Sequence, residues 1–139
     1  MNFVLDCSIA MAWCFEDEAT EFTDSLLELL IEGNAKVPGI WPLEVANVLA
    51  ISERKGRTNQ AKITQFLQLL NDLPITVDIK TGEKAFTDVL TLARTNRLTS
   101  YDAAYLELAL REGLPLATLD ERLKRVALNL GVATRGGTG

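Results

Sequence analysis

The stretch Phe3-Val4-Leu5-Asp6-Cys7-Ser8 determines how we interpret the rest of this sequence. Its three apolar residues are typical of a short buried strand, and an acid follows directly at the carboxyl end of that strand. Open α/β sheets bind their ligands at this edge. Strand-like and helical segments alternate along the chain, which predicts a parallel sheet covered by helices on both faces. We therefore expect an α/β fold in which Asp6 faces a ligand site.

The composition limits the class of protein. A chain of 139 residues, 47% of them hydrophobic, fits one domain with a sizeable core and contains no region of disordered composition. No apolar run reaches the ~18 residues of a membrane span, and no basic leader precedes the first strand. We expect a cytoplasmic protein without a membrane partner, in which Cys7 and Cys14 are reduced.

The sequence contains no histidine, which excludes histidine general bases, Ser-His triads and His-liganded zinc. It also lacks a glycine-rich phosphate loop, because Gly136-Gly137 lies near the end of the chain and outside any strand-to-helix turn. Carboxylates with a hard cation remain as the catalytic possibility. The net charge of −5 disfavours a simple basic nucleic-acid binder but is compatible with an acidic metal pocket.

Apolar periodicity, helix caps and helix-breaking residues predict the bounds of the other helices and strands. Ser8 is the expected N-cap of the first helix, and Thr58 or Asn59 that of the fourth. We assign residues 1–135 to one domain and residues 136–139 to a flexible C-terminal tail. The expected helices are 9–15, 22–31, 42–54, 60–70, 85–96, 99–112 and 122–130, and the further strands are 36–40, 75–79, 115–119 and 132–134.

Three further acids stand beside apolar segments, as Asp6 does. Glu44 lies in the first turn of one expected helix, Asp102 in that of another, and Asp120 directly follows a strand-like run. Each has an ordinary explanation as a helix cap or a partner of the helix dipole. Because parallel strands place the helix N-termini at one edge, however, we expect the four acids to converge. Mg²⁺ or Mn²⁺ would relieve their repulsion and could activate water for attack on a phosphodiester.

The sequence resembles the PIN-domain family and, within it, the VapC ribonuclease toxins of type II toxin–antitoxin pairs. The matching stretches occur in family order and span nearly the whole chain: Val4–Ser8, Pro42–Leu49, Leu98–Leu106 and Leu116–Asp120. The most specific parts are Tyr-Asp-Ala-Ala-Tyr at 101–105 and Ala-Thr-Leu-Asp at 117–120. The resemblance implies a three-layer α/β/α sandwich with a five-stranded parallel sheet. It also implies endoribonuclease activity that depends on Mg²⁺ or Mn²⁺.

The same resemblance implies roles for individual residues. The family's catalytic acids correspond here to Asp6, Glu44, Asp102 and Asp120. Asp6 and Asp102 are implied as the direct magnesium ligands, and Ser8 and Thr118 as hydroxyls that orient the acids. Asn47 lies one helical turn from Glu44, where it could contact metal-bound water or phosphate.

Substrate and partners are also implied. Three basic residues close the helix that carries Glu44: Arg54, Lys55 and Arg57. They are candidates for binding RNA phosphates, although a basic helix C-terminus has the same composition. The resemblance further implies a homodimer and a VapB-type antitoxin. Trp13, Phe15 and the exposed part of the apolar stripe at 22–31 are the candidate groove for that antitoxin.

Two other classes of protein share some of these sequence features. A receiver-like signalling module also gathers acids at strand ends, but it needs an early pair of acids and a lysine after a late strand. Here Asp6 stands alone, and no lysine lies between the late strand and Asp120. A haloacid-dehalogenase-like phosphatase needs a second acid where Ser8 stands, so we reject it. A PIN nuclease in RNA processing remains open.

Overall fold

The computed structural model describes residues 2–135, so Met1 and the expected tail at 136–139 lie outside the described residues. One sheet of five parallel strands forms its centre, in the order β3-β2-β1-β4-β5, which confirms the expected sheet. The strands are β1 (Asn2–Leu5), β2 (Asn34–Val37), β3 (Ile75–Val77), β4 (Leu116–Ala117) and β5 (Thr134–Arg135).

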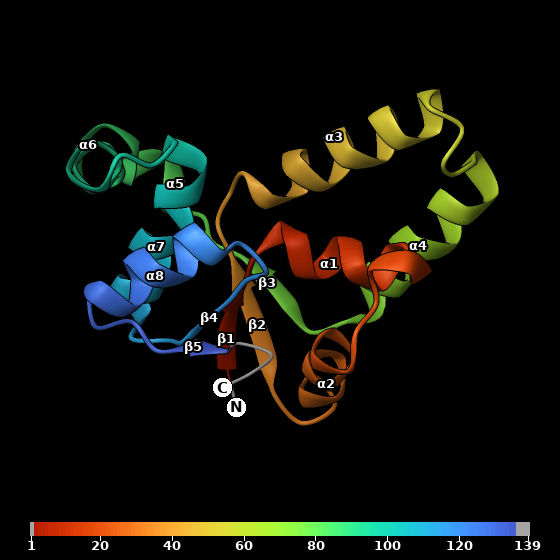
Figure 1. Ribbon diagram of the computed structural model, residues 1–139, viewed down its shortest axis with the longest axis horizontal. Helices are drawn as coiled ribbons and strands as arrows, with labels where there is room; N and C mark the ends of the chain where they lie inside the picture. Colours follow the sequence, from red (N-terminus) through yellow and green to blue (C-terminus); the bar gives the residue numbers. More distant parts are fainter. Residues whose placement is uncertain (1, 136–139) are drawn as a thin grey trace.

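Helices cover the sheet on both sides and complete a three-layer α/β/α sandwich (Figure 1). The first group contains α1 (Cys7–Cys14), a 3-10 turn η1 (Glu16–Glu18), α2 (Glu21–Leu29), α3 (Trp41–Arg54) and α4 (Gln60–Asp72). The second contains α5 (Thr81–Lys84), a π-helical turn η2 (Ala85–Val89), α6 (Leu90–Asn96), α7 (Ser100–Glu112) and α8 (Glu121–Asn129). No helix within residues 2–135 is long and apolar enough to cross a membrane.

The two groups of helices occupy opposite faces because the chain reverses its direction across the sheet. It steps outward from β1 through β2 to β3, then returns to place β4 on the other side of β1. Since parallel crossovers are right-handed, this reversal moves the later helices to the other face. The crevice between the carboxyl ends of β1 and β4 is therefore the switch point at which such sheets bind ligands. Receiver modules have the order 2-1-3-4-5 instead, so the strand order contradicts that alternative.

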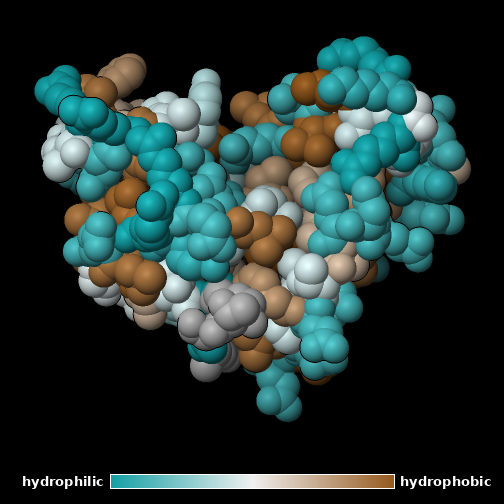
Figure 2. Space-filling model, viewed as in Figure 1, coloured by the Kyte–Doolittle hydropathy of each residue, from teal (hydrophilic) through white to brown (hydrophobic). Residues whose placement is uncertain are grey.

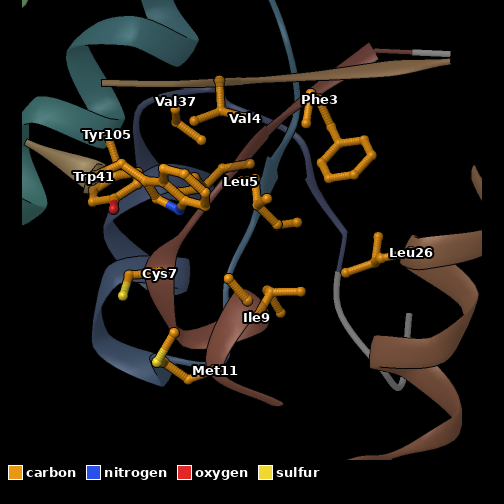
Figure 3. Close-up of a cluster of buried hydrophobic side chains, with 14 of the residues drawn as sticks. Phe3, Val4, Leu5, Cys7, Ile9, Met11, Leu26, Val37, Trp41 and Tyr105 are labelled. Atoms are coloured by element: carbon orange, nitrogen blue, oxygen red, sulfur yellow. The ribbon is translucent and has the colours of Figure 1, made fainter. Parts of the chain in front are cut away.

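Strand β1 and helix α7 form the centre of the core. Phe3, Val4 and Leu5 are completely buried, as expected for a central strand covered on both faces. Every residue of α7 from 103 to 109 is buried, and Ala103 and Ala104 pack in a small cluster with Val89. Figure 3 shows the part of the main core that β1, α1 and their neighbours build. The elements that carry Asp6 and Asp102 are thus fixed by the best-packed part of the protein.

Several expected boundaries were wrong. Helix α1 begins at Cys7, so Ser8 lies inside its first turn and is not its N-cap. Strand β2 begins at Asn34 and ends before Pro38, which has no N–H for a strand ladder. The helix expected at 85–96 begins earlier, at Thr81, and its residues 85–89 form a π-helical turn, which apolar periodicity does not reveal. The last strand is 134–135 instead of 132–134, whereas Asn59 is confirmed as the cap of α4.

Candidate metal centre

The structure brings the four predicted acids to the carboxyl edge of the sheet. Asp6 directly follows β1, and Asp120 follows β4 by three residues, so the two flank the switch point. Glu44 and Asp102 lie in the first turns of α3 and α7. The charge of Asp102 acts on Glu44, that of Asp120 acts on Asp102, and that of Asp6 acts on both Glu44 and Asp102. Figure 2 shows the molecule indented at this edge, between α3 and α5.

Two hydroxyl groups hold the carboxylate of Asp6. Its Oδ2 accepts hydrogen bonds from Ser8 Oγ at 2.6 Å and from Thr118 Oγ1 at 2.7 Å. Thr118 Oγ1 in turn accepts the backbone N–H of Asp120 at 3.0 Å, and Ser8 Oγ accepts that of Leu119 at 3.1 Å. The hydroxyls therefore orient Asp6 and also join the end of β1 to the loop after β4. This geometry fits the orienting role expected for Ser8 and Thr118.

Tyr105 is a residue of this site that sequence analysis did not assign to it. Tyr105 is completely buried, and its phenol group donates a hydrogen bond to Glu44 Oε1 at 2.5 Å. Tyr105 lies three residues after Asp102 and so on the same side of α7. A buried tyrosine needs a partner for its hydroxyl, and its spacing from Asp102 was the available sequence indication. The bond orients Glu44 from the same helix that carries Asp102.

The remaining predicted residues have different surroundings. Asp120 is exposed, and its Oδ1 accepts the N–H of Leu123 at 3.0 Å, so it also serves as the N-cap of α8. Asp102 is half-buried, and its N–H donates to Thr99 Oγ1 at 3.1 Å. The capping explanation is thus correct for Asp120, whereas at α7 the side chain of Thr99 is the cap. Asn47 is exposed, one turn beyond Glu44 on α3.

Burial and mutual repulsion make negative charge costly at this edge. Burial raises the pKa of Asp6, Glu44 and Asp102, and the neighbouring carboxylates raise each further. Burial, with the charges of Glu44 and Asp6, also raises the pKa of the Cys7 thiol to about 12. Without a bound cation, Cys7 is therefore a protonated thiol. A bound cation would reverse the penalty on the carboxylates.

The donor set fits a hard divalent cation that keeps much of its water. The four acids and the two hydroxyls offer oxygen, which Mg²⁺ and Mn²⁺ prefer. Within residues 2–135, no three acidic or thiol side chains stand close enough together to enclose a metal ion. Mg²⁺ is usually held by only one or two carboxylates and several waters, so Asp6 and Asp102 could suffice as direct ligands. The residues thus fit an open, hydrated site and not a closed cage.

The basic cluster expected to bind RNA lies elsewhere. Arg57 donates to Asp17 and Glu18, each at 2.8 Å, and its guanidinium lies 3.8 Å from the ring centroid of Phe15. Arg57 is therefore engaged within the chain. Arg54 lies at the other end of α3, ten residues or about 15 Å along the helix from the acid that α3 carries. The structure does not bring this cluster to the acids.

A family model agrees with this architecture. The model of the PIN domain matches residues 3–129, so the chain belongs to the PIN-domain family. PIN domains are in general nucleases and typically bind divalent metals. The chain thus belongs to a family whose members are in general nucleases.

Solved structures share the fold. The crystal structure of PAE2754 from Pyrobaculum aerophilum is 24% identical, with a TM-score of 0.69 over 97% of this chain and 84% of that one. That of VapBC2 from Rickettsia felis, bound to a DNA fragment from their promoter, is 18% identical, with a TM-score of 0.64 over 96% of this chain and 97% of that one. No curated protein matches the sequence.

Proposed function

We propose that this chain is a divalent-metal-dependent endoribonuclease and the toxin of a type II VapBC toxin–antitoxin system. The observation that carries the proposal is the fixed carboxylate of Asp6, held by two hydroxyls at the switch point and surrounded by three further acids. Membership of the PIN-domain family supports the nuclease chemistry. The likeness in fold to VapBC2, over nearly all of both chains, supports the narrower toxin proposal.

Each residue has a defined part in this chemistry. Asp6 and Asp102 would hold a divalent cation, which would supply an activated water and neutralise charge at the phosphate. Ser8 and Thr118 keep the carboxylate of Asp6 in one orientation, and Tyr105 does the same for Glu44. Because the chain has no histidine, carboxylates and water must handle the proton of the attacking nucleophile.

The first test is metal-dependent cleavage. Purified protein should cleave single-stranded RNA in Mg²⁺ or Mn²⁺ and lose this activity in EDTA, because its hydrolytic groups are carboxylates. Gel analysis of end-labelled oligonucleotides gives the rate, with DNA of the same sequence as the substrate control. Restoring Mn²⁺ after EDTA should recover the rate, which shows that chelation has not unfolded the protein. Cleavage that persists after thorough chelation would contradict the metal mechanism.

A groove beside α4 supports an antitoxin partner. A cavity of about 750 Å³ lies between the end of α1 and α4. Its apolar lining includes the more accessible Trp13 and Leu69, with the core residues Phe15 and Phe66 at its base. An amphipathic segment could place its apolar side chains there, and an arginine of that segment could reach the acids in competition with the metal. The expected stripe at 22–31 contributes less than proposed, because Leu26 and Leu30 are buried in the core.

Assembly can be measured directly. If the neighbouring reading frame encodes a small protein of the antitoxin kind, its co-expression with the chain should give a complex that lacks ribonuclease activity. Alone it should form a homodimer, which two almost fully exposed side chains, Ile79 and Phe86, support as an apolar contact surface. Light scattering with size exclusion gives the mass of both species. A monomer that binds no such partner would end the toxin proposal but leave an RNA-processing nuclease open.

A further inference from the structure

Arg122 joins the start of α8 to the end of α6. It lies in the first turn of α8, two residues after Asp120, and its side chain is exposed. Its Nη2 donates a hydrogen bond to the carbonyl oxygen of Arg97. Arg97 ends α6 in the left-handed conformation, with φ of 55°, and leads into the turn before α7. Arg122 therefore spans from the start of α8 to the approach of α7.

This position puts positive charge beside the acids. The charge of Arg122 lowers the pKa of Asp102, whereas the charges of Asp6 and Asp120 raise it. Two basic residues of the cluster at 54–57 lie away from the acids. Arg57 is paired with two acids of η1, and Arg54 is at the far end of α3. Sequence analysis gave Arg122 no role.

An RNA-cleaving site with acids at its centre needs cations at its rim. RNA brings negative charge at every nucleotide, and the metal neutralises it only at the phosphate that is cleaved. A guanidinium matches a phosphate with paired N–H donors, and the bond to the carbonyl of Arg97 occupies only one nitrogen of Arg122. That bond also restricts the side chain of Arg122, so the side chain loses less conformational entropy when it binds a phosphate.

We propose that Arg122 binds the RNA phosphate next to the one that is cleaved. It is thus a substrate-binding residue at the rim of the metal centre, and the carbonyl of Arg97 holds it in place. This inference rests on the proposed ribonuclease function and extends it to the substrate. It also replaces the cluster at 54–57 as the place where the chain meets the RNA backbone.

Substitution can separate the charge of Arg122 from the rest of its side chain. Arg122→Gln removes the charge and shortens the side chain, whereas Arg122→Lys keeps the charge. We expect Arg122→Gln to raise KM for an RNA oligonucleotide about tenfold, to leave kcat within about twofold, and to reduce the salt dependence of binding by about one phosphate contact. Arg122→Lys should stay within about threefold of wild type. Arg125→Gln, the same change one turn further along α8, is the matched control.

Two further measurements separate the alternatives. If Arg122 acted only through Asp102 and the metal, Arg122→Gln would shift the Mn²⁺ midpoint and leave the salt dependence unchanged, which would overturn the proposal. Equal KM and salt dependence for Arg122→Gln and Arg125→Gln would overturn it too. Anisotropy of labelled RNA, with each substitution placed in an Asp6→Asn background, measures binding without turnover. Weaker RNA binding there by Arg122→Gln alone would support the inference even if the wild-type chain proved not to be a ribonuclease.

Discussion

Asp6→Asn and Asp102→Asn are each expected to lower RNA cleavage by at least about 10²- to 10³-fold while the protein remains folded. Each change removes one of the two carboxylates that we propose as direct metal ligands, with almost no change in volume. In Asp6→Asn, the amide oxygen can still accept the hydroxyls of Ser8 and Thr118, so the junction between β1 and β4 should persist. Single-turnover cleavage in saturating Mn²⁺ is the measurement.

The same variants should gain stability in the absence of metal. The pKa values of Asp6, Glu44 and Asp102 are raised in the folded state, so this state binds protons more tightly than the unfolded chain does. The stability of the wild type in EDTA should therefore fall as the pH rises from the ordinary values of 3.8 for Asp and 4.5 for Glu through the raised values. Asp102→Asn should weaken this fall, which urea unfolding at pH 5 and pH 7 can test.

The control for both effects is Asp24→Asn, which changes an exposed acid on α2, outside the site. It should cleave RNA at the wild-type rate and show the wild-type dependence of stability on pH. If Asp6→Asn and Asp102→Asn were as active as this control, the proposed metal centre would be wrong. Circular dichroism would show whether an inactive variant is also unfolded. In that case Tyr105→Phe becomes the test of the site, because it removes the hydrogen bond to Glu44 and leaves all four acids in place.

The sequence was informative where chemistry follows directly from local pattern. The apolar run before Asp6 predicted a central buried strand, and the alternation of elements predicted the parallel sheet that the structure contains. Contacts between distant segments could not be predicted in this way. The bond from Tyr105 to Glu44 joins residues 61 positions apart, and Arg57 is paired with acids about 40 positions away. In the sequence alone, Tyr105 is equally typical of an ordinary core residue, and Arg57 of a basic helix end. Only the fold shows that each has a partner far away along the chain.

The largest effect on stability is expected from Arg111, which sequence analysis did not single out. Its Nε and Nη2 donate to both oxygens of Glu107, at 2.8 and 2.9 Å. Its Nη1 and Nη2 donate to the two oxygens of Asp78, at 3.1 and 2.7 Å. The side chain of Glu107 is only 5% exposed and that of Asp78 10%. One guanidinium therefore compensates two acids that have little access to water, one from α7 and one from the end of β3.

Further contacts extend this network across the sheet. Thr81 Oγ1 donates to Asp78 Oδ2 at 3.2 Å and accepts the N–H of Gly39 at 2.8 Å. The N–H of Asp78 also donates to the carbonyl of Val37 at 2.8 Å. The ends of β2 and β3 and the start of α5 are thus tied to α7 through Arg111. Arg111 lies nine residues, or about 13 Å along the helix, from Asp102, so the network supports the fold at a distance from the acids.

Arg111→Met should therefore lower the free energy of unfolding by about 3–5 kcal/mol, because it leaves the buried carboxylate of Glu107 and the partly buried carboxylate of Asp78 without their cation. This is a large part of the 5–15 kcal/mol typical of a domain, so the midpoint of urea unfolding should fall sharply. Lys36→Met is the matched control, since it removes the more exposed ion pair of Lys36 with Glu112 and should cost less than about 1 kcal/mol. Adding Glu107→Leu to Arg111→Met should recover part of the loss, because one uncompensated charge disappears. Equal losses for Arg111→Met and Lys36→Met would show that the network contributes no more than a surface ion pair.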